Sequence, residues 1–127
     1  MQDKAVYEFA IIRVVPKVER SEFLNVGVIL LSKKLRYIDM KYILDKQRLS
    51  AFSDHIDFDE LQNYLEAWDA VCRGKSEGGK IGELPEHERF RWLTASKSTI
   101  LQCSPVHPGI GLNVEQKLED LFQKYVL

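Results

Sequence analysis

The feature that most constrains the fold is an apolar run near the start of the sequence, residues 5–15, interrupted only by Glu8 and Arg13. Successive side chains of a β-strand point to opposite faces of its sheet. Both alternating sets of positions in this run are mainly apolar, so a strand here would need cover on each face. The run therefore predicts a central strand, ended by Pro16, which has no N–H to donate to a neighbouring strand.

Two further runs rich in β-branched residues follow, at positions 24–31 and 36–44. The short polar segment at 32–34 is of the kind that closes a hairpin. Two or three antiparallel strands are therefore expected first, and residues 98–103 could form another strand.

The apolar spacing then changes to three and four residues, which is typical of helices. Asp57 is expected to cap a helix, with Glu60 completing a capping box, and Gly74 is a natural stop. A shorter helix is expected at 46–52, and the glycine-rich segment 77–82 is expected to be an exposed loop. A C-terminal amphipathic helix is predicted by one apolar face, formed by Val114, Leu118, Leu121, Phe122 and Tyr125.

Together these patterns predict an α+β fold, with an antiparallel sheet of about three to five strands and helices packed on it. A chain of 127 residues fits a single globular domain, residues 1–127. The formal charge of −1 gives no reason to expect a general attraction to nucleic acid or anionic lipid, so either role would need a local basic patch.

No signal peptide and no apolar run approaching the ~20 residues that span a bilayer is visible, so a cytoplasmic protein without a membrane partner is expected. Cys72 and Cys103 form no Cys-x-x-Cys pair, and free thiols are the plain interpretation. No metal-binding, cofactor-binding or phosphate-loop motif is present, so no metal or cofactor is expected.

The first of two unusual stretches runs from residue 20 to residue 28. Asn25 and Gly27 are expected to share one face of a strand, and a glycine inside a strand usually marks a bulge or a close approach by another group. Arg20 and Glu22 precede that strand. They either pair and fix the loop after Pro16, or take part in binding or acid–base chemistry.

The second stretch runs from residue 89 to residue 107 and holds Arg89, Arg91, Lys97 and His107 but no Asp or Glu. With the hydroxyl groups nearby, including that of Ser98, this composition suits an anion such as a phosphate, a carboxylate or the acidic surface of a partner. The alternative is that Arg89 and Lys97 are solvated and that Arg91 pairs with an acid elsewhere.

His107 is the strongest candidate for general acid–base chemistry, because the ordinary pKa of histidine, ~6.5, lies near neutrality. It is flanked by Val106 and Pro108, and a proline-stiffened loop is expected to hold it. Such a histidine could also merely cap a turn. Cys103 lies near it in sequence, but is expected to pack in the core rather than act as a nucleophile.

Several of these residues form a pattern that resembles a bacterial family, domain of unknown function 3037. The pattern comprises Tyr7, Arg13 and Pro16, then Arg20-x-Glu22-Phe23-x-Asn25-Val26-Gly27-Val28, then Arg89-Phe90-Arg91-Trp92-Leu93-Thr94, Ser98-Thr99, and Ser104-Pro105-Val106-His107-x-Gly109. An arginine often precedes the Ser-Thr pair in that family, where this chain has Lys97. The family brings no activity. Its members are sometimes encoded beside kinase-like proteins, which implies a role as a partner.

Two hypotheses follow. The favoured one is a non-enzymatic binding or accessory module for a protein partner or a small anionic ligand, with no role for nucleic acid, and with a polar pocket formed by Arg13, Arg20, Glu22, Asn25, Arg91, Ser98 and His107. The other is a small enzyme acting on a phosphate-bearing or nucleic-acid substrate. In that enzyme His107 or Glu22 would be the catalytic acid or base, and Arg20 and Arg91 would stabilise developing negative charge.

Overall fold

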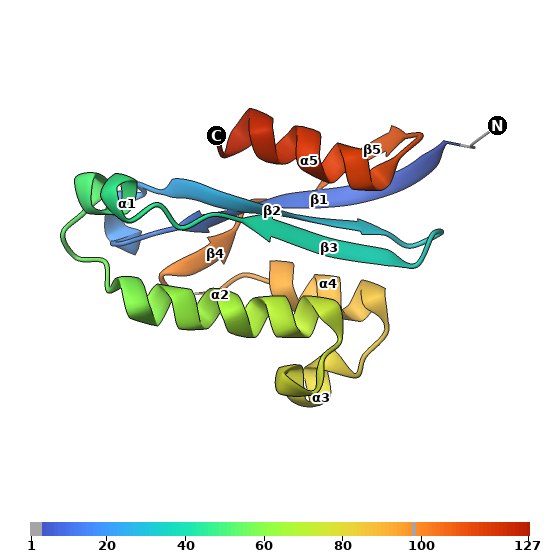
Figure 1. Cartoon of the computed structure of the whole chain (residues 1–127), viewed down its shortest axis with the longest axis horizontal. Coiled ribbons are helices and arrows are strands. Elements are labelled where there is room, and N and C mark those ends of the chain that lie inside the picture. The colour runs from blue at the N-terminus through green and yellow to red at the C-terminus, as the bar shows by residue number, and fades with distance from the viewer. Residues whose placement is uncertain (1–3, 98) are drawn as a thin grey trace.

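The computed structural model describes residues 4–97 and 99–127, and it has an antiparallel sheet with helices on both faces (Figure 1). The sheet has five strands in the order β3-β2-β1-β4, with β5 also paired to β1. The strands are β1 (Ala5–Val14), β2 (Leu24–Ser32), β3 (Tyr37–Tyr42), β4 (Leu101–Cys103) and β5 (His107–Gly111). The α+β class is confirmed, and β1 is the central strand that its two apolar faces predicted.

The helices form a layer on each side of this sheet (Figure 1). They are α1 (Lys46–Phe52), α2 (Phe58–Arg73), α3 (Gly79–Gly82), α4 (Glu86–Thr94) and α5 (Val114–Tyr125). α2 and α4 cover one face, whereas α5 lies on the other. No helix in the described part of the chain is long and apolar enough to cross a bilayer.

Local signals in the sequence place the helix ends. The side chain of Asp57 accepts a hydrogen bond from the Glu60 N–H at the start of α2, and Asn113 caps α5 in the same way. These caps satisfy N–H groups that have no partner inside the helix. Gly74 ends α2 with a φ of 70°, a left-handed conformation that glycine adopts without strain.

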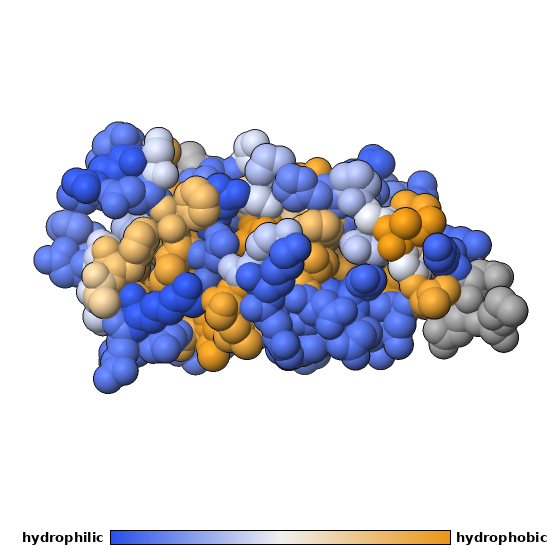
Figure 2. All heavy atoms as spheres, turned by 90° about the horizontal axis from the view of Figure 1, so that it is seen from above, coloured by the Kyte–Doolittle hydropathy of each residue, from blue (hydrophilic) through white to orange (hydrophobic). Residues whose placement is uncertain are grey.

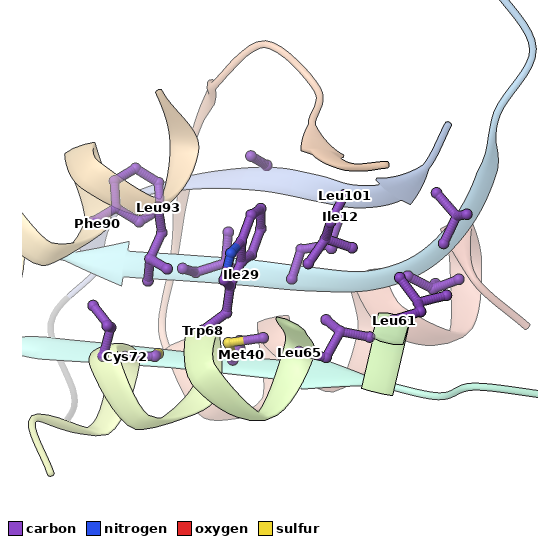
Figure 3. Packing of buried hydrophobic residues seen from close by; sticks show 14 of the residues in the cluster. Ile12, Ile29, Met40, Leu61, Leu65, Trp68, Cys72, Phe90, Leu93 and Leu101 are labelled. Carbon is purple, nitrogen blue, oxygen red and sulfur yellow. The ribbon is translucent and has the colours of Figure 1, made fainter. Parts of the chain in front are cut away.

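Two apolar clusters stabilise the sheet from opposite faces. The larger one lies between the sheet and α2 and α4, and includes Ile12, Ile29, Leu61, Leu65, Trp68, Phe90, Leu93 and Leu101 (Figure 3). The smaller one lies under α5, and includes Tyr7, Ile11, Val28, Leu30, Val114, Leu118 and Phe122. Residues alternate between the two clusters along β1, as strand geometry requires.

A β-bulge in β2 changes which residues share a face. Ile12 pairs with Gly27, but Arg13 pairs with Asn25, so Val26 is an extra residue in the ladder. The prediction that Asn25 and Gly27 share one face was therefore wrong. Asn25 points to the α5 side, where it donates a hydrogen bond to α5. Gly27 is the ladder partner of Ile12 and shares the face that α2 and α4 cover. The bulge that a glycine within a strand predicted is present.

Three segments differ from their expected structure. Residues 77–82 form short helical turns rather than a loop, and residues 86–94 form α4, for which no helix was expected. The strand expected at 98–103 covers only Leu101–Cys103. Each of these segments is short or rich in charged residues, so its conformation depends on packing against α2 and the sheet rather than on a strong local pattern.

Candidate functional site

Several of the predicted polar residues meet at the end of the molecule where β1 leads into β2. Arg13, near the end of β1, is the ladder partner of Asn25 in β2. The Asn25 side-chain amide donates a hydrogen bond of 3.1 Å to the carbonyl oxygen of Tyr125 at the end of α5. Arg48 of α1 donates one of 2.8 Å to the carbonyl oxygen of Val126. The end of α5 is therefore held in place by two side chains that satisfy its last carbonyl groups.

Arg13 is the most unusual residue at this end. Its guanidinium lies over the Phe23 ring, 4.0 Å from the ring centre, which fixes its position by a cation–π contact. Within residues 4–97 and 99–127, no carboxylate pairs with it. Its Nε and the neighbouring Asn25 Oδ1 are both buried without a hydrogen-bond partner. A positioned cation and an unused acceptor therefore lie on adjacent strands.

Aromatic rings continue this surface toward β5. The Phe9 ring lies 6.4 Å from that of Tyr125 and 5.4 Å from that of His107. Phe23 and Tyr125 are 45% and 40% exposed. Viewed from the α5 side, apolar side chains reach the surface around the end where α5 finishes (Figure 2). We call the set Phe9, Arg13, Phe23, Asn25, His107 and Tyr125 the α5-end surface.

Arg20 and Glu22 form an exposed ion pair in the loop that follows β1. The hydrogen bond from Arg20 to Glu22 raises the pKa of the arginine above its ordinary value, and the pairing expected from the sequence is present. The pair lines a shallow pocket of about 240 Å³ together with Lys17, Asp54 and His55. The formal charges of Lys17 and Arg20 are balanced by those of Glu22 and Asp54, so this pocket has no net positive charge to attract an anion.

The structure separates Arg91 from the other candidates. Arg91 is exposed on α4, on the sheet face opposite α5, so it cannot share a pocket with Arg13, Asn25 and His107. It makes no ion pair within the described ranges. Ser98 lies outside the described residues.

The other two cations of the second stretch stabilise helix ends. Arg89 is buried and donates to the carbonyl oxygens of Val71 at 3.3 Å and Cys72 at 3.0 Å, so the expectation that it is solvated was wrong. Lys97 donates to the carbonyl oxygen of Trp92 at 2.6 Å, and burial lowers its pKa. Both bond the last turn of a helix, where a cation interacts favourably with the helix dipole. Much of the local positive charge is therefore structural.

His107 and Cys103 lie on opposite faces of the sheet. His107 is exposed at the start of β5 rather than in a loop, because β5 pairs with β1 and His107 lies opposite Phe9. Cys103 lies opposite Ile12 and packs against the cluster under α2 and α4, as expected. Burial raises the pKa of the Cys103 thiol to about 12. The two residues therefore do not form a nucleophile–base pair.

Sequence reasoning missed the aromatic part of the site. Phe23 stands within the polar stretch that drew attention, and its place two residues before Asn25 was the available signal. Tyr125 was assigned to the apolar face of its helix, and Phe9 lay within the apolar run at 5–15. Their convergence depends on how α5 crosses the sheet, which no local pattern reveals.

This arrangement is an α+β fold with a cationic and aromatic surface beside the end of α5. In the described part of the chain, no three His, Cys, Asp or Glu side chains are placed to hold a metal ion. The chain belongs to the family described as Protein of unknown function (DUF3037), whose model matches residues 9–126. No match was found among curated proteins or among solved structures.

Proposed function

We propose that this chain is a non-enzymatic binding module that takes an anionic group of a protein partner or a small ligand at the α5-end surface. The observation that carries the proposal is Arg13, whose guanidinium is held on Phe23 and has no carboxylate partner among the described residues. A guanidinium is a planar fork that binds a carboxylate or phosphate through two parallel hydrogen bonds. Holding it in place before binding lowers the entropy cost of forming them.

The surroundings of Arg13 favour a protein partner over a free inorganic ion. Phe23 and Tyr125 expose apolar ring surface beside the cation, and aromatic side chains often anchor protein interfaces. An acidic side chain with apolar neighbours would contact both kinds of group at once. The kinase-like partner that the family resemblance implies is one candidate to supply that acid.

The test is an NMR titration of the full chain with two probes, a tetraglutamate peptide and inorganic phosphate. We expect shifts centred on the Arg13 side-chain Nε–H and the Asn25 amide. Arg13→Lys should weaken binding at least roughly tenfold, because a hydrogen bond to a charged group is worth about 1.5–3 kcal/mol and about 1.4 kcal/mol corresponds to a factor of ten.

Arg91→Lys is the matched control, because Arg91 is an exposed arginine on the other side of the sheet. It should leave the affinity for both probes unchanged. Equal affinities for wild type and Arg13→Lys, or shifts centred away from β1 and β2, would contradict the proposal. Stronger binding of the peptide than of phosphate is expected if the aromatic rings contribute.

The alternative of a small enzyme with His107 or Glu22 as acid or base has no comparable support. Glu22 is engaged by Arg20, and His107 contacts the Phe9 ring. General acid–base chemistry needs a group within hydrogen-bond reach of the reacting atom, usually oriented by a second group. No observation favours this function over binding.

A further inference from the structure

A second exposed surface lies where β1 begins and β5 ends, on the face of the sheet that α2 and α4 cover elsewhere. The strands extend past both helices at this end (Figure 1). Val6 of β1 and Ile110 of β5 are ladder partners, and they are 61% and 60% exposed. Glu8 and Pro108 form the next pair along the same strands and point to the same face. Two large aliphatic side chains therefore lie together on an uncovered part of the sheet.

Charged side chains of both signs border this aliphatic pair. Glu8, Lys33 and Lys34 line a hollow of about 450 Å³ together with Val6. None of these three charged residues forms an ion pair within residues 4–97 and 99–127. We call Val6, Glu8, Lys33, Lys34, Pro108 and Ile110 the Val6 face.

The edges of the sheet offer less to a partner than this face does. At the β3 edge, Asp39 pairs with Arg73 of α2, and Lys41 pairs with Glu119 of α5. At the other edge, β5 contains Pro108, which has no N–H to offer an added strand. Charged residues and prolines on edge strands discourage pairing with another chain. A partner is therefore expected to pack on the face.

We propose that the Val6 face is a self-association surface on which a second copy of this chain packs its own Val6 face. The charges favour a second copy, because one face supplies both the carboxylate and the ammonium groups that an interface of this composition needs. In a two-fold dimer the same patch meets itself. With Val6 near the axis, Glu8 of each copy would meet Lys33 or Lys34 of its partner, and the aliphatic pairs would cover each other.

The expected dimer is weak and depends on concentration. The aliphatic centre is only two residues wide, and interfaces at the low end of the size range are typical of transient complexes. We expect a dissociation constant that rises with salt, because the ion pairs lie at the rim. The Val6 face and the α5-end surface lie on opposite faces of the sheet, so a variant of one need not disturb the other.

Charge reversal tests the proposal by sedimentation velocity on the full chain, from about 10 µM to about 1 mM, where mass action reveals weak dimers. Glu8→Lys alone, and Lys33→Glu with Lys34→Glu, should each weaken dimerisation at least roughly tenfold through like-charge repulsion. Mixing the two variant proteins should restore association, because each then meets its opposite charge. Ile110→Asn should weaken dimerisation by a similar factor.

Val18→Asn is the matched control for Ile110→Asn, because Val18 is a similarly exposed aliphatic residue, at 56%, in the segment that follows β1. It should leave dimerisation unchanged. A wild-type chain that stays monomeric at the highest concentration would overturn the proposal. So would a dimer that both charge-reversed variants retain, or two reversed variants that do not associate when mixed. Urea unfolding of each variant shows whether a loss of association reflects a loss of folding.

Discussion

The buried arginine of α4 allows a stability prediction to be worked out from contacts. Arg89 is 8% exposed, and its guanidinium donates to the carbonyl oxygens of Val71 and Cys72 at the end of α2. Replacing it with methionine keeps most of the apolar stem but removes the charge and both hydrogen bonds. The Arg89→Met variant therefore isolates the polar contribution of the arginine.

The expected loss is the difference between two opposing terms. Each hydrogen bond from a charged donor is worth about 1.5–3 kcal/mol, and a partly buried cation at a helix C-terminus adds up to about 2 kcal/mol. Against this, the buried charge has lost its hydration, and Nε has no hydrogen-bond partner in the structure, which costs about 1–3 kcal/mol. We expect Arg89→Met to lower the free energy of unfolding by about 2–3 kcal/mol.

Urea unfolding followed by circular dichroism measures this change. The midpoint should fall while the m-value stays constant, since the surface exposed on unfolding is nearly the same. Arg89→Ala should lose about 1–2 kcal/mol more, because it also leaves a cavity. Substitutions at uninvolved surface positions usually change stability by no more than about 0.5 kcal/mol. An effect of Arg89→Met within that range would refute the account of Arg89 as a cap for α2.

Four further outcomes are expected. Gly27→Ala should lower stability by about 1–3 kcal/mol in urea, because an added Cβ would lie 2.7 Å from a carbonyl oxygen of β3. Lys97→Met should cost about 1–2 kcal/mol through lost bonds to the end of α4, whereas Lys97→Arg should retain them. Burial raises the pKa of Cys72 and Cys103 to about 12. Above pH ~8.5 the thiols ionise in the unfolded chain but not in the folded one. The free energy of unfolding should therefore fall by about 1.4 kcal/mol per pH unit for each thiol, and the fall should be less steep in the Cys72→Ala/Cys103→Ala double variant. Arg13→Met should stay within about 1 kcal/mol of wild-type stability while losing affinity for the tetraglutamate peptide.

Elements with a strong periodic pattern were predictable from the sequence. The continuous apolar run gave β1 and its central place, because a strand with two apolar faces has no other stable position in a layered fold. Asp57 and Gly74 marked the ends of α2, because caps act through bonds to neighbouring residues. Such signals act between residues close in the sequence, so contacts with distant segments did not change these elements.

Features set by contacts between distant segments were not predictable. The extra residue Val26 reverses the faces of every residue before it in β2, and the bulge is a property of the β1–β2 ladder rather than of either strand. The helix α4 has an apolar core contact at Phe90 and Leu93 surrounded by charged residues, so its periodic pattern is weak. Only packing against α2 and the sheet makes these segments regular.

The same distinction applies to the α5-end surface. The proximity of Arg13 and Asn25 follows from the antiparallel pairing of neighbouring strands, which the sequence predicted. Tyr125 lies 100 residues beyond Asn25 in the chain, and its backbone carbonyl oxygen accepts the hydrogen bond from Asn25. No spacing rule connects positions so far apart. The polar half of the surface was therefore predictable from the sequence, and the aromatic half was not.

The two arginines that the fold partly or fully buries differ in a way that bears on function. Arg89 finds two backbone acceptors at the end of a helix, so its burial is explained by stability. Arg13 has no carboxylate and no backbone acceptor in the described residues, and its buried Nε lies on the strand next to the unpaired Asn25 Oδ1. A buried polar group without a partner costs about 1–3 kcal/mol, which the contact with Phe23 offsets only in part. The buried Nε is itself closed to an outside group, so a bound anion would use the terminal N–H₂ groups of the guanidinium, for which the described residues supply no carboxylate.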